Sequence, residues 1–183
     1  MTERRTILAI SGSTRTGSSN ESILRYLESQ YSEVLEFVFY PGLTSLPHFN
    51  PDFDSTPPAS VVQLRQSISD ADGILICTPE YIFALPGALK NLIEWLVSTT
   101  IMDGKPTAYI VASGLGERSF ESLGVILKTL SAQVSEESKL LIQGARAKMS
   151  ANAGPKDEQT SQDLDRLMKS LISSLNIQTA RSS

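Results

Sequence analysis

With 183 residues, of which 40% are hydrophobic and 20% charged, the chain has the length and composition of one globular domain. Twenty acidic against sixteen basic residues give a net charge of −4, which argues against a general nucleic-acid binder, because phosphate backbones are bound by clustered lysine and arginine. One cysteine and one histidine exclude an internal disulfide and a cysteine–histidine zinc site.

The uninterrupted apolar runs, such as residues 7–10 and 74–77, are far shorter than the roughly 20 residues of a membrane span. The first six residues, Met-Thr-Glu-Arg-Arg-Thr, lack the apolar core of a signal peptide. We therefore expect a soluble, cytoplasmic protein without a membrane partner.

Short apolar runs alternate with amphipathic segments along the chain. Residues 6–10, 73–77 and 107–112 predict strands that are buried on both faces. Residues 34–40 are rich in strand-forming side chains, and residues 139–142 predict a fifth strand.

Apolar residues at helical spacing predict five helices between and after these strands. The first runs from Ser18 to about Tyr31 and opens on Ser18-Ser-Asn-Glu21, which fits a capping box. The second ends near Ala71. The other three are marked by the apolar stripes Leu85, Leu89, Leu92, Ile93, Leu96 and Val97, then Phe120, Leu123, Leu127 and Leu130, and finally Leu164, Leu167, Met168, Leu171, Ile172 and Leu175.

Strands that alternate with helices indicate a parallel sheet covered on both sides. We predict one α/β domain over residues 1–183, a flavodoxin-like three-layer sandwich with the strand order 2-1-3-4-5. Residues 41–58 predict a long ordered loop after the second strand, and residues 150–160 a link to the last helix. We expect the tail, residues 176–183, to be frayed.

The segment that leaves the first strand, residues 11–20, places hydroxyls, glycines and one arginine at the N-terminus of a helix, where free N–H groups and the helix dipole favour a phosphate. Gly12 and Gly17 have the spacing of a P-loop, but Ser18 stands where its lysine is required, which disfavours NTP hydrolysis. Thr14 replaces the second glycine of a dinucleotide-binding G-x-G-x-x-G, and a thiol-based phosphate loop would need a cysteine here.

The remaining hypothesis is a site for a single phosphate, held by Ser13, Arg15, Ser18 and Asn20 together with backbone amides. The alternative is that Ser18 only caps the helix and the glycines only turn the chain. Capping accounts for Ser18 and Glu21, but not for so many hydroxyls and an arginine in one turn. We favour the phosphate site.

Two motifs, in this order, resemble those of the NAD(P)H-dependent FMN reductase family, which includes flavin, quinone, azo-dye and chromate reductases. They are Gly12-Ser-Thr-Arg-x-x-Ser18-x-Asn20 and Pro79-Glu-Tyr followed by Pro86-Gly-x-Leu-Lys-Asn-x-Ile-Glu-Trp-Leu96, and the resemblance covers about two-thirds of the chain. It implies a bound FMN that takes hydride from NADPH or NADH and passes it to a flavin, a quinone or a similar small-molecule acceptor.

The flavin carries this chemistry, so we expect neither a catalytic side chain nor a metal. Two alternatives stay open: a non-enzymatic electron carrier of the flavodoxin type, and a phosphate-binding module without redox activity. Arg15 favours the reductase over the carrier, whose phosphate site is normally built from neutral hydroxyls.

The resemblance also assigns residues. It implies that the FMN phosphate is held by Ser13, Arg15, Ser18 and Asn20, with Ser11 and Ser19 beside them. It places Pro79, Glu80, Tyr81, Ile82 and Phe83 along the isoalloxazine ring, and Ser113, Gly114 and Gly116 at the other edge of the ring.

The sequence departs from the family pattern in two places. Ile82 replaces an asparagine that is usual after the tyrosine, which we expect to remove an amide near the flavin. Glu117 and Arg118 directly follow Gly116, where the family often has a richer glycine loop, and this change would affect how nicotinamide or the acceptor docks.

Other residues near these motifs have competing interpretations. Glu80 could tune the flavin or accept backbone hydrogen bonds in its tight turn, and Tyr81 and Phe83 could simply plug the end of the sheet. Cys77 is expected to be a small core residue and His48 a loop residue.

Trp95 lies beside Ala88 on a helical wheel, well to one side of the apolar stripe. We expect this patch to be an exposed partner surface, and the resemblance implies a homodimer or homotetramer that forms through this helix. The alternative is that Trp95 packs beneath a neighbouring loop.

Overall fold

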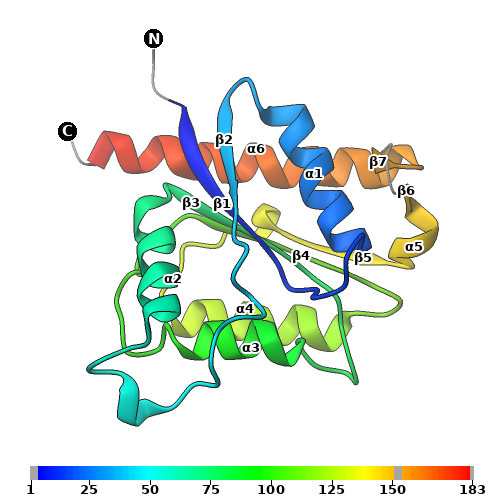
Figure 1. Ribbon diagram of the computed structural model, residues 1–183. Helices are drawn as coiled ribbons and strands as arrows, with labels where there is room; N and C mark the ends of the chain where they lie inside the picture. The colour runs from blue at the N-terminus through cyan, green and yellow to red at the C-terminus, as the bar shows by residue number, and fades with distance from the viewer. Residues whose placement is uncertain (1–3, 151–153, 182–183) are drawn as a thin grey trace.

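Five parallel strands form the central sheet of the computed structural model, which describes residues 4–150 and 154–181, with the side chains of the last helix described up to Leu175. The sheet order is β2-β1-β3-β4-β5, as predicted (Figure 1). The strands are β1 Arg5–Ser11, β2 Leu35–Phe39, β3 Gly73–Thr78, β4 Thr107–Ser113 and β5 Lys139–Gln143. Every residue of β3 is buried, which is why this strand is apolar along its whole length.

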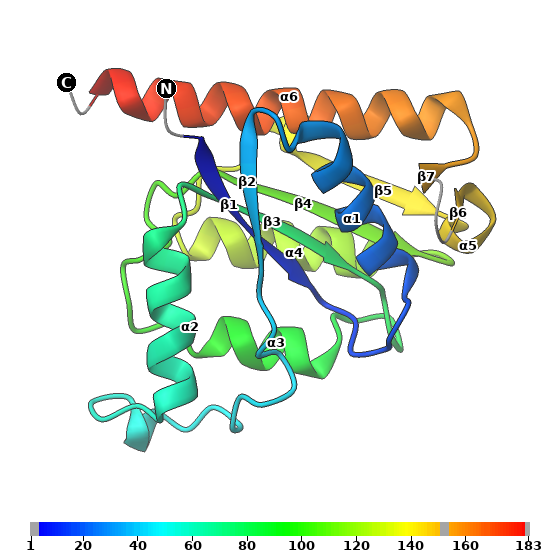
Figure 2. The same cartoon turned by 45° about the horizontal axis from the view of Figure 1, so that its top comes forward.

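Helices cover both faces of the sheet (Figure 2). Helices α1 (Ser19–Tyr31) and α6 (Glu158–Arg181) pack on one face, and α2 (Ala59–Asp70), α3 (Gly87–Glu94) and α4 (Glu117–Thr129) on the other. Alternate residues of β1 serve the two layers: Ile7 and Ala9 contact the core under α1 and α6, whereas Leu8 and Ile10 contact the core under α2, α3 and α4. The chain is therefore a three-layer sandwich, as its alternating pattern predicted.

Short elements complete the fold. They are the 3₁₀ turns η1 (Pro51–Phe53) and η2 (Glu136–Ser138), the helix α5 (Ala145–Lys148), and the two-stranded pair β6 (Met149–Ser150) and β7 (Gly154–Pro155). The link predicted at residues 150–160 thus contains part of a small hairpin, whose residues 151–153 lie outside the described residues. Helix α6 runs to Arg181, but the side chains after Leu175 and residues 182–183 also lie outside them, so fraying of the tail stays a prediction.

The expected surface at Trp95 is wrong. Trp95 is fully buried, because the loop between β2 and α2 folds over it: the indole Nε1–H donates a hydrogen bond to the Pro47 carbonyl (2.8 Å), and the ring of Phe49 packs edge-on at 5.1 Å between centroids. Asn91 joins the same contact by accepting from the Phe49 N–H (2.7 Å). Helix α3 also ends at Glu94, earlier than the stripe to Val97 predicted, and Val97 is exposed.

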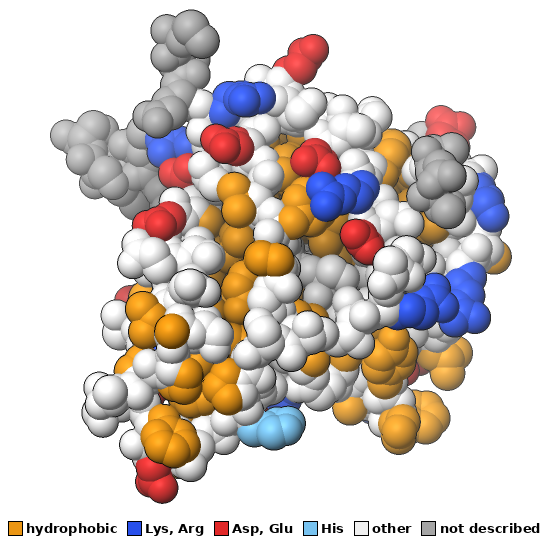
Figure 3. Space-filling view, in the orientation of Figure 1, with side chains coloured by type: hydrophobic (Ala, Val, Ile, Leu, Met, Phe, Trp, Pro, Cys, Tyr) orange, Lys and Arg blue, Asp and Glu red, His pale blue; other side chains and the backbone are white. Residues whose placement is uncertain are grey.

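Surface features agree with a mixed exterior. Charged side chains of both signs are interspersed over the face in Figure 3, and His48, drawn in pale blue, is exposed on the β2–α2 loop. Among the described residues, every helix is too short or too polar to cross a membrane.

Candidate functional site

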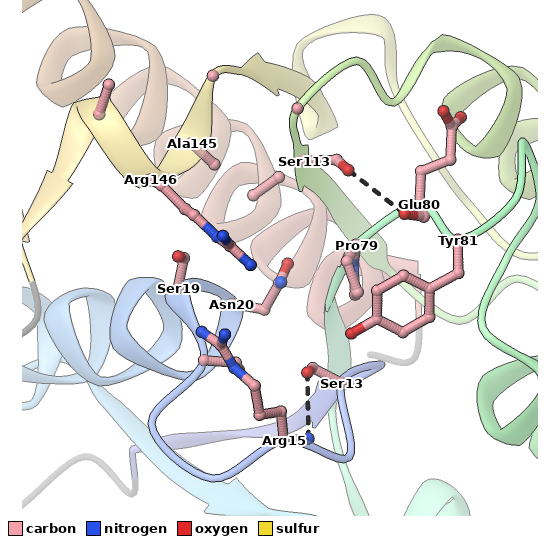
Figure 4. A pocket seen from close by; sticks show the side chains of 15 residues that line it. Ser13, Arg15, Ser19, Asn20, Pro79, Glu80, Tyr81, Ser113, Ala145 and Arg146 are labelled. Carbon is pink, nitrogen blue, oxygen red and sulfur yellow. Dashed lines mark hydrogen bonds between the residues drawn. The ribbon is translucent and has the colours of Figure 1, made fainter.

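A cavity of about 450 Å³ opens where β1, β3, β4 and β5 reach their carboxyl ends (Figure 4). The chain leaves β1 toward β2 at one edge and later returns to β3 on the other side, so the cavity lies at the point where the strand order reverses. Ligands of open parallel sheets bind at this position.

Gly12 brings the first loop across the end of β3. Its N–H donates to the Cys77 carbonyl (2.8 Å), and a Cβ atom added here would lie 2.6 Å from Thr78 Cβ and 3.0 Å from Leu89 Cδ2. Only glycine permits so close an approach. The loop then turns at Gly17, which has a φ of 65°, and enters α1 at the floor of the cavity.

The start of α1 supplies polar groups to this floor. Ser18 is buried and caps the helix, because its Oγ accepts the Glu21 N–H (3.1 Å), so the capping interpretation is confirmed. Asn20 is also buried, and its Oδ1 accepts a hydrogen bond from the Cys77 Sγ (3.3 Å). Burial raises the pKa of the Cys77 thiol, which therefore remains protonated as a core group that fixes Asn20.

Two arginines face the cavity from opposite sides (Figure 4). Arg15 comes from the first loop and Arg146 from α5, and within the described part of the chain neither side chain has a hydrogen bond or ion pair. Glu80 is the one carboxylate among the lining residues, and its oxygens accept the N–H groups of Gly116 (3.2 Å) and Ser119 (2.9 Å) at the start of α4. The cavity is therefore electropositive, and Glu80 accepts backbone hydrogen bonds from a helix rather than from its own turn.

The loop after β3 divides into a lining part and an exposed tip. Pro79 and Tyr81 line the cavity, whereas Ile82 and Phe83 do not and are 95% and 70% exposed. Tyr81 and Ala84 exchange both backbone hydrogen bonds (2.9 and 3.0 Å), and φ is 50° at Ile82 and 57° at Phe83. These values are those of a two-residue hairpin turn with left-handed central residues.

This geometry changes the meaning of the first departure from the family pattern. Asparagine tolerates the left-handed region far better than a β-branched residue does. Ile82 thus introduces backbone strain at a tip outside the cavity, and the expectation that it removes an amide from the flavin's surroundings is wrong for this geometry.

The structure brings together most of the residues that sequence reasoning selected. Those that line the cavity are Ser13, Arg15, Ser18, Ser19, Asn20, Pro79, Glu80, Tyr81, Ser113 and Gly114. Outside its lining are Ser11, Ile82, Phe83 and Gly116. Ser11 supports the first loop, because its Oγ accepts the Ser13 N–H (3.4 Å), and Gly116 opens α4 with a φ of 101°.

Sequence reasoning missed the contribution of the segment after β5. Gly144, Ala145, Arg146 and Ala147 line the cavity, and Arg146 adds a charged side chain. The signal was available, because the rule that ligands meet the carboxyl ends of parallel strands applies to the fifth strand as well.

A parallel sheet of this order, with a ligand-sized cavity at its switch point, defines a flavodoxin-like α/β protein. Within that class the chain belongs to the NADPH-dependent FMN reductase family, whose model matches residues 5–147.

Individual proteins show the same relationship. The chain is 34% identical to the quinone reductase of Escherichia coli K12 over 120 residues, which are 63% of each protein, so the match spans less than two thirds of that relative. It is 30% identical to NADH-dependent flavin reductase subunit 2 of Lactobacillus johnsonii over 81% of this chain and 84% of that one. The structure of FerB, a flavoenzyme NAD(P)H:(acceptor) oxidoreductase of Paracoccus denitrificans, superposes with a TM-score of 0.83 at 26% identity, covering 94% of this chain and 97% of FerB.

Proposed function

We propose that this protein is an FMN-dependent NAD(P)H oxidoreductase that passes electrons to a small-molecule acceptor such as a quinone or a flavin. The observation that carries the proposal is one cavity with two chemically different ends. Hydroxyl, amide and guanidinium donors gather over the start of α1, and Pro79 and Tyr81 give the β3 side an apolar wall.

The donor set fits the phosphate of FMN. Ser13, Ser19 and Asn20 offer neutral donors beside the helix N-terminus, and Arg15 offers a charged one with no competing partner in the described chain. The neighbouring Ser18 is occupied as an acceptor by the Glu21 N–H, which leaves its hydroxyl proton available as a donor.

The other end suits a flat ring. Pro79 and Tyr81 would lie along one side of the isoalloxazine, and the Ser113–Gly114 segment along an edge. A Cβ atom placed on Gly114 would meet nothing within 4 Å, so this side of the cavity is open. We propose that the open side admits the nicotinamide and then the acceptor.

When bound, FMN would supply the redox chemistry, taking electrons from reduced nicotinamide and releasing them to the acceptor. The chain's own task is to bind and orient. Glu80 contributes by joining two loops: its carboxylate caps α4, and its carbonyl accepts a weak hydrogen bond from Ser113 Oγ (3.5 Å).

The test is anaerobic mixing of FMN-loaded protein with NADPH or NADH, followed through the visible absorbance of the flavin. We expect at least one nucleotide to bleach the flavin within seconds, and added quinone, free flavin, azo dye or metal oxyanion to restore the colour at different rates. A flavodoxin-type carrier is the alternative, because it shares the sheet order. That alternative gains if dithionite bleaches the flavin and neither nucleotide does.

We also propose a cytoplasmic location, where NAD(P)H is available, and assembly into a homodimer or homotetramer. The exposed apolar side chains of Ile82, Phe83 and Leu115 offer contact surface for assembly, in place of the buried Trp95. Sedimentation velocity would measure the oligomeric state directly, and a monomer at high concentration would contradict it.

A further inference from the structure

Arg146 is fixed at the cavity by the way α5 is anchored. Gly144 turns the chain directly after β5 with a φ of 65°, and its N–H donates to the Gly114 carbonyl at the end of β4 (3.1 Å). Ala145 is then buried in the core under α1 and α6. The residue that follows, Arg146, is thereby directed over the start of α1 (Figure 4).

The charges around Arg146 call for an anion. Arg15 lies across the same space, and the first turn of α1 adds the positive end of a helix dipole. The one lining carboxylate, Glu80, is engaged with the start of α4. Two like charges that face one cavity repel each other, and this repulsion is relieved when an anion binds between them.

We infer that Arg146 is the second guanidinium of the phosphate subsite, and that it holds the phosphomonoester end of FMN from the side opposite Arg15. This inference rests on the proposed function. A phosphomonoester carries about −1.5 to −2 charges at neutral pH, which two guanidinium groups match better than one. Arginine also donates two parallel hydrogen bonds to such a group.

Lys148 provides a matched control. It lies on the same short helix two residues further on, it is exposed, and it is outside the lining of the cavity. Replacing either residue by glutamine removes one positive charge from α5, but only Arg146→Gln removes a group that faces the phosphate subsite.

The experiment is titration of apo-protein with FMN and, separately, with riboflavin, which has the same ring and no phosphate. We expect Arg146→Gln to raise the Kd for FMN about tenfold and to leave the Kd for riboflavin unchanged. Lys148→Gln should leave both constants within about twofold. Added salt should weaken FMN binding more in the wild type than in Arg146→Gln.

Several outcomes would overturn the assignment. An FMN Kd for Arg146→Gln within twofold of the wild type, while the wild type binds FMN well, overturns it alone. An equal loss of riboflavin affinity would show that Arg146 supports the ring or the fold, and a raised KM for NADPH with an unchanged FMN Kd would assign Arg146 to the nucleotide. Wild-type protein that binds neither flavin would overturn the proposed function together with this inference. The melting temperature of the apo-variants confirms that the fold is intact.

Discussion

At the scale of single residues, the turn at Ile82 and Phe83 departs from local preference. Both residues adopt left-handed backbone angles, and both expose apolar side chains to solvent. Each feature is unfavourable, and neither is offset by packing, since the two side chains are largely exposed. Strained residues of this kind cluster at ligand sites, and this turn follows directly on the lining residue Tyr81.

Relief of the strain should be measurable as stability. Phe83→Gly allows the left-handed angle without a Cβ, whereas Phe83→Ala removes the same ring and keeps the strain. We expect the glycine variant to unfold with a free energy about 1 kcal/mol higher than that of the alanine variant, in spite of the greater unfolded-state entropy of glycine. Urea denaturation monitored by circular dichroism measures the difference. An alanine variant as stable as the glycine variant would contradict the expectation.

Cys77 should be chemically silent in the folded protein. Burial raises the pKa of its thiol, so the reactive thiolate does not form, and the side chain is shielded from reagents. We expect no modification by a thiol reagent at pH 7 to 9, and complete modification in guanidinium chloride. Since the unfolded thiol ionises near pH 8.5, folding stability should fall as the pH rises above that value, and Cys77→Ala should lack this loss. Rapid labelling of the native protein would disprove this account.

At the scale of elements, the loop between β2 and α2 is held as firmly as a helix. Arg65 on α2 donates to the Trp95 carbonyl (2.8 and 3.1 Å) and pairs with Asp54 at 2.6 Å, and Trp95 and Asn91 bond to Pro47 from below. These contacts position α3, whose N-terminus follows the loop that lines the cavity.

Truncation of Trp95 should therefore destabilise the fold. Trp95→Ala leaves a large cavity and an unpaired Pro47 carbonyl, and we expect it to lower the free energy of unfolding by about 3–5 kcal/mol. Val97→Ala, one turn away at an exposed position, should change it by less than about 0.5 kcal/mol. Chemical denaturation separates the two cases. A Trp95→Ala variant of normal stability but smaller assembly size would restore Trp95 to an interface.

At the scale of the whole molecule, the parallel sheet makes one site out of distant segments. Ser13, Pro79, Ser113 and Arg146 meet because four strands end at the same edge. Ligand binding at that edge should therefore stabilise the domain as a unit.

Binding should appear as a shift of global stability. At a free FMN concentration 100 times the Kd, linkage adds about 2.7 kcal/mol to the free energy of unfolding, so the melting temperature should rise by several degrees. Arg15→Ala should reduce the gain at the same FMN concentration by an amount of the order of 1.5–3 kcal/mol, because a charge-assisted contact is lost from an exposed loop. A melting temperature that does not depend on FMN would argue against an FMN site.

The sequence by itself determined the strand and helix pattern, the strand order, the family and the first two loops of the site. These features depend on local periodicity and on motifs contiguous in the chain, such as Ser13 to Asn20 and Pro79 to Tyr81. The capping role of Ser18 and the core position of Cys77 could also be predicted, since each depends on near neighbours or on a buried strand.

Only the tertiary structure decided which long-range contacts each side chain makes. The helical wheel placed Trp95 away from the core stripe of α3, but it could not show that residues 41–58 fold over that side. It likewise took the fold to bring Arg146 opposite Arg15, and Glu80 to the start of α4. Helical and strand periods report which side of an element is apolar, whereas contacts between loops depend on where the whole sheet places their ends.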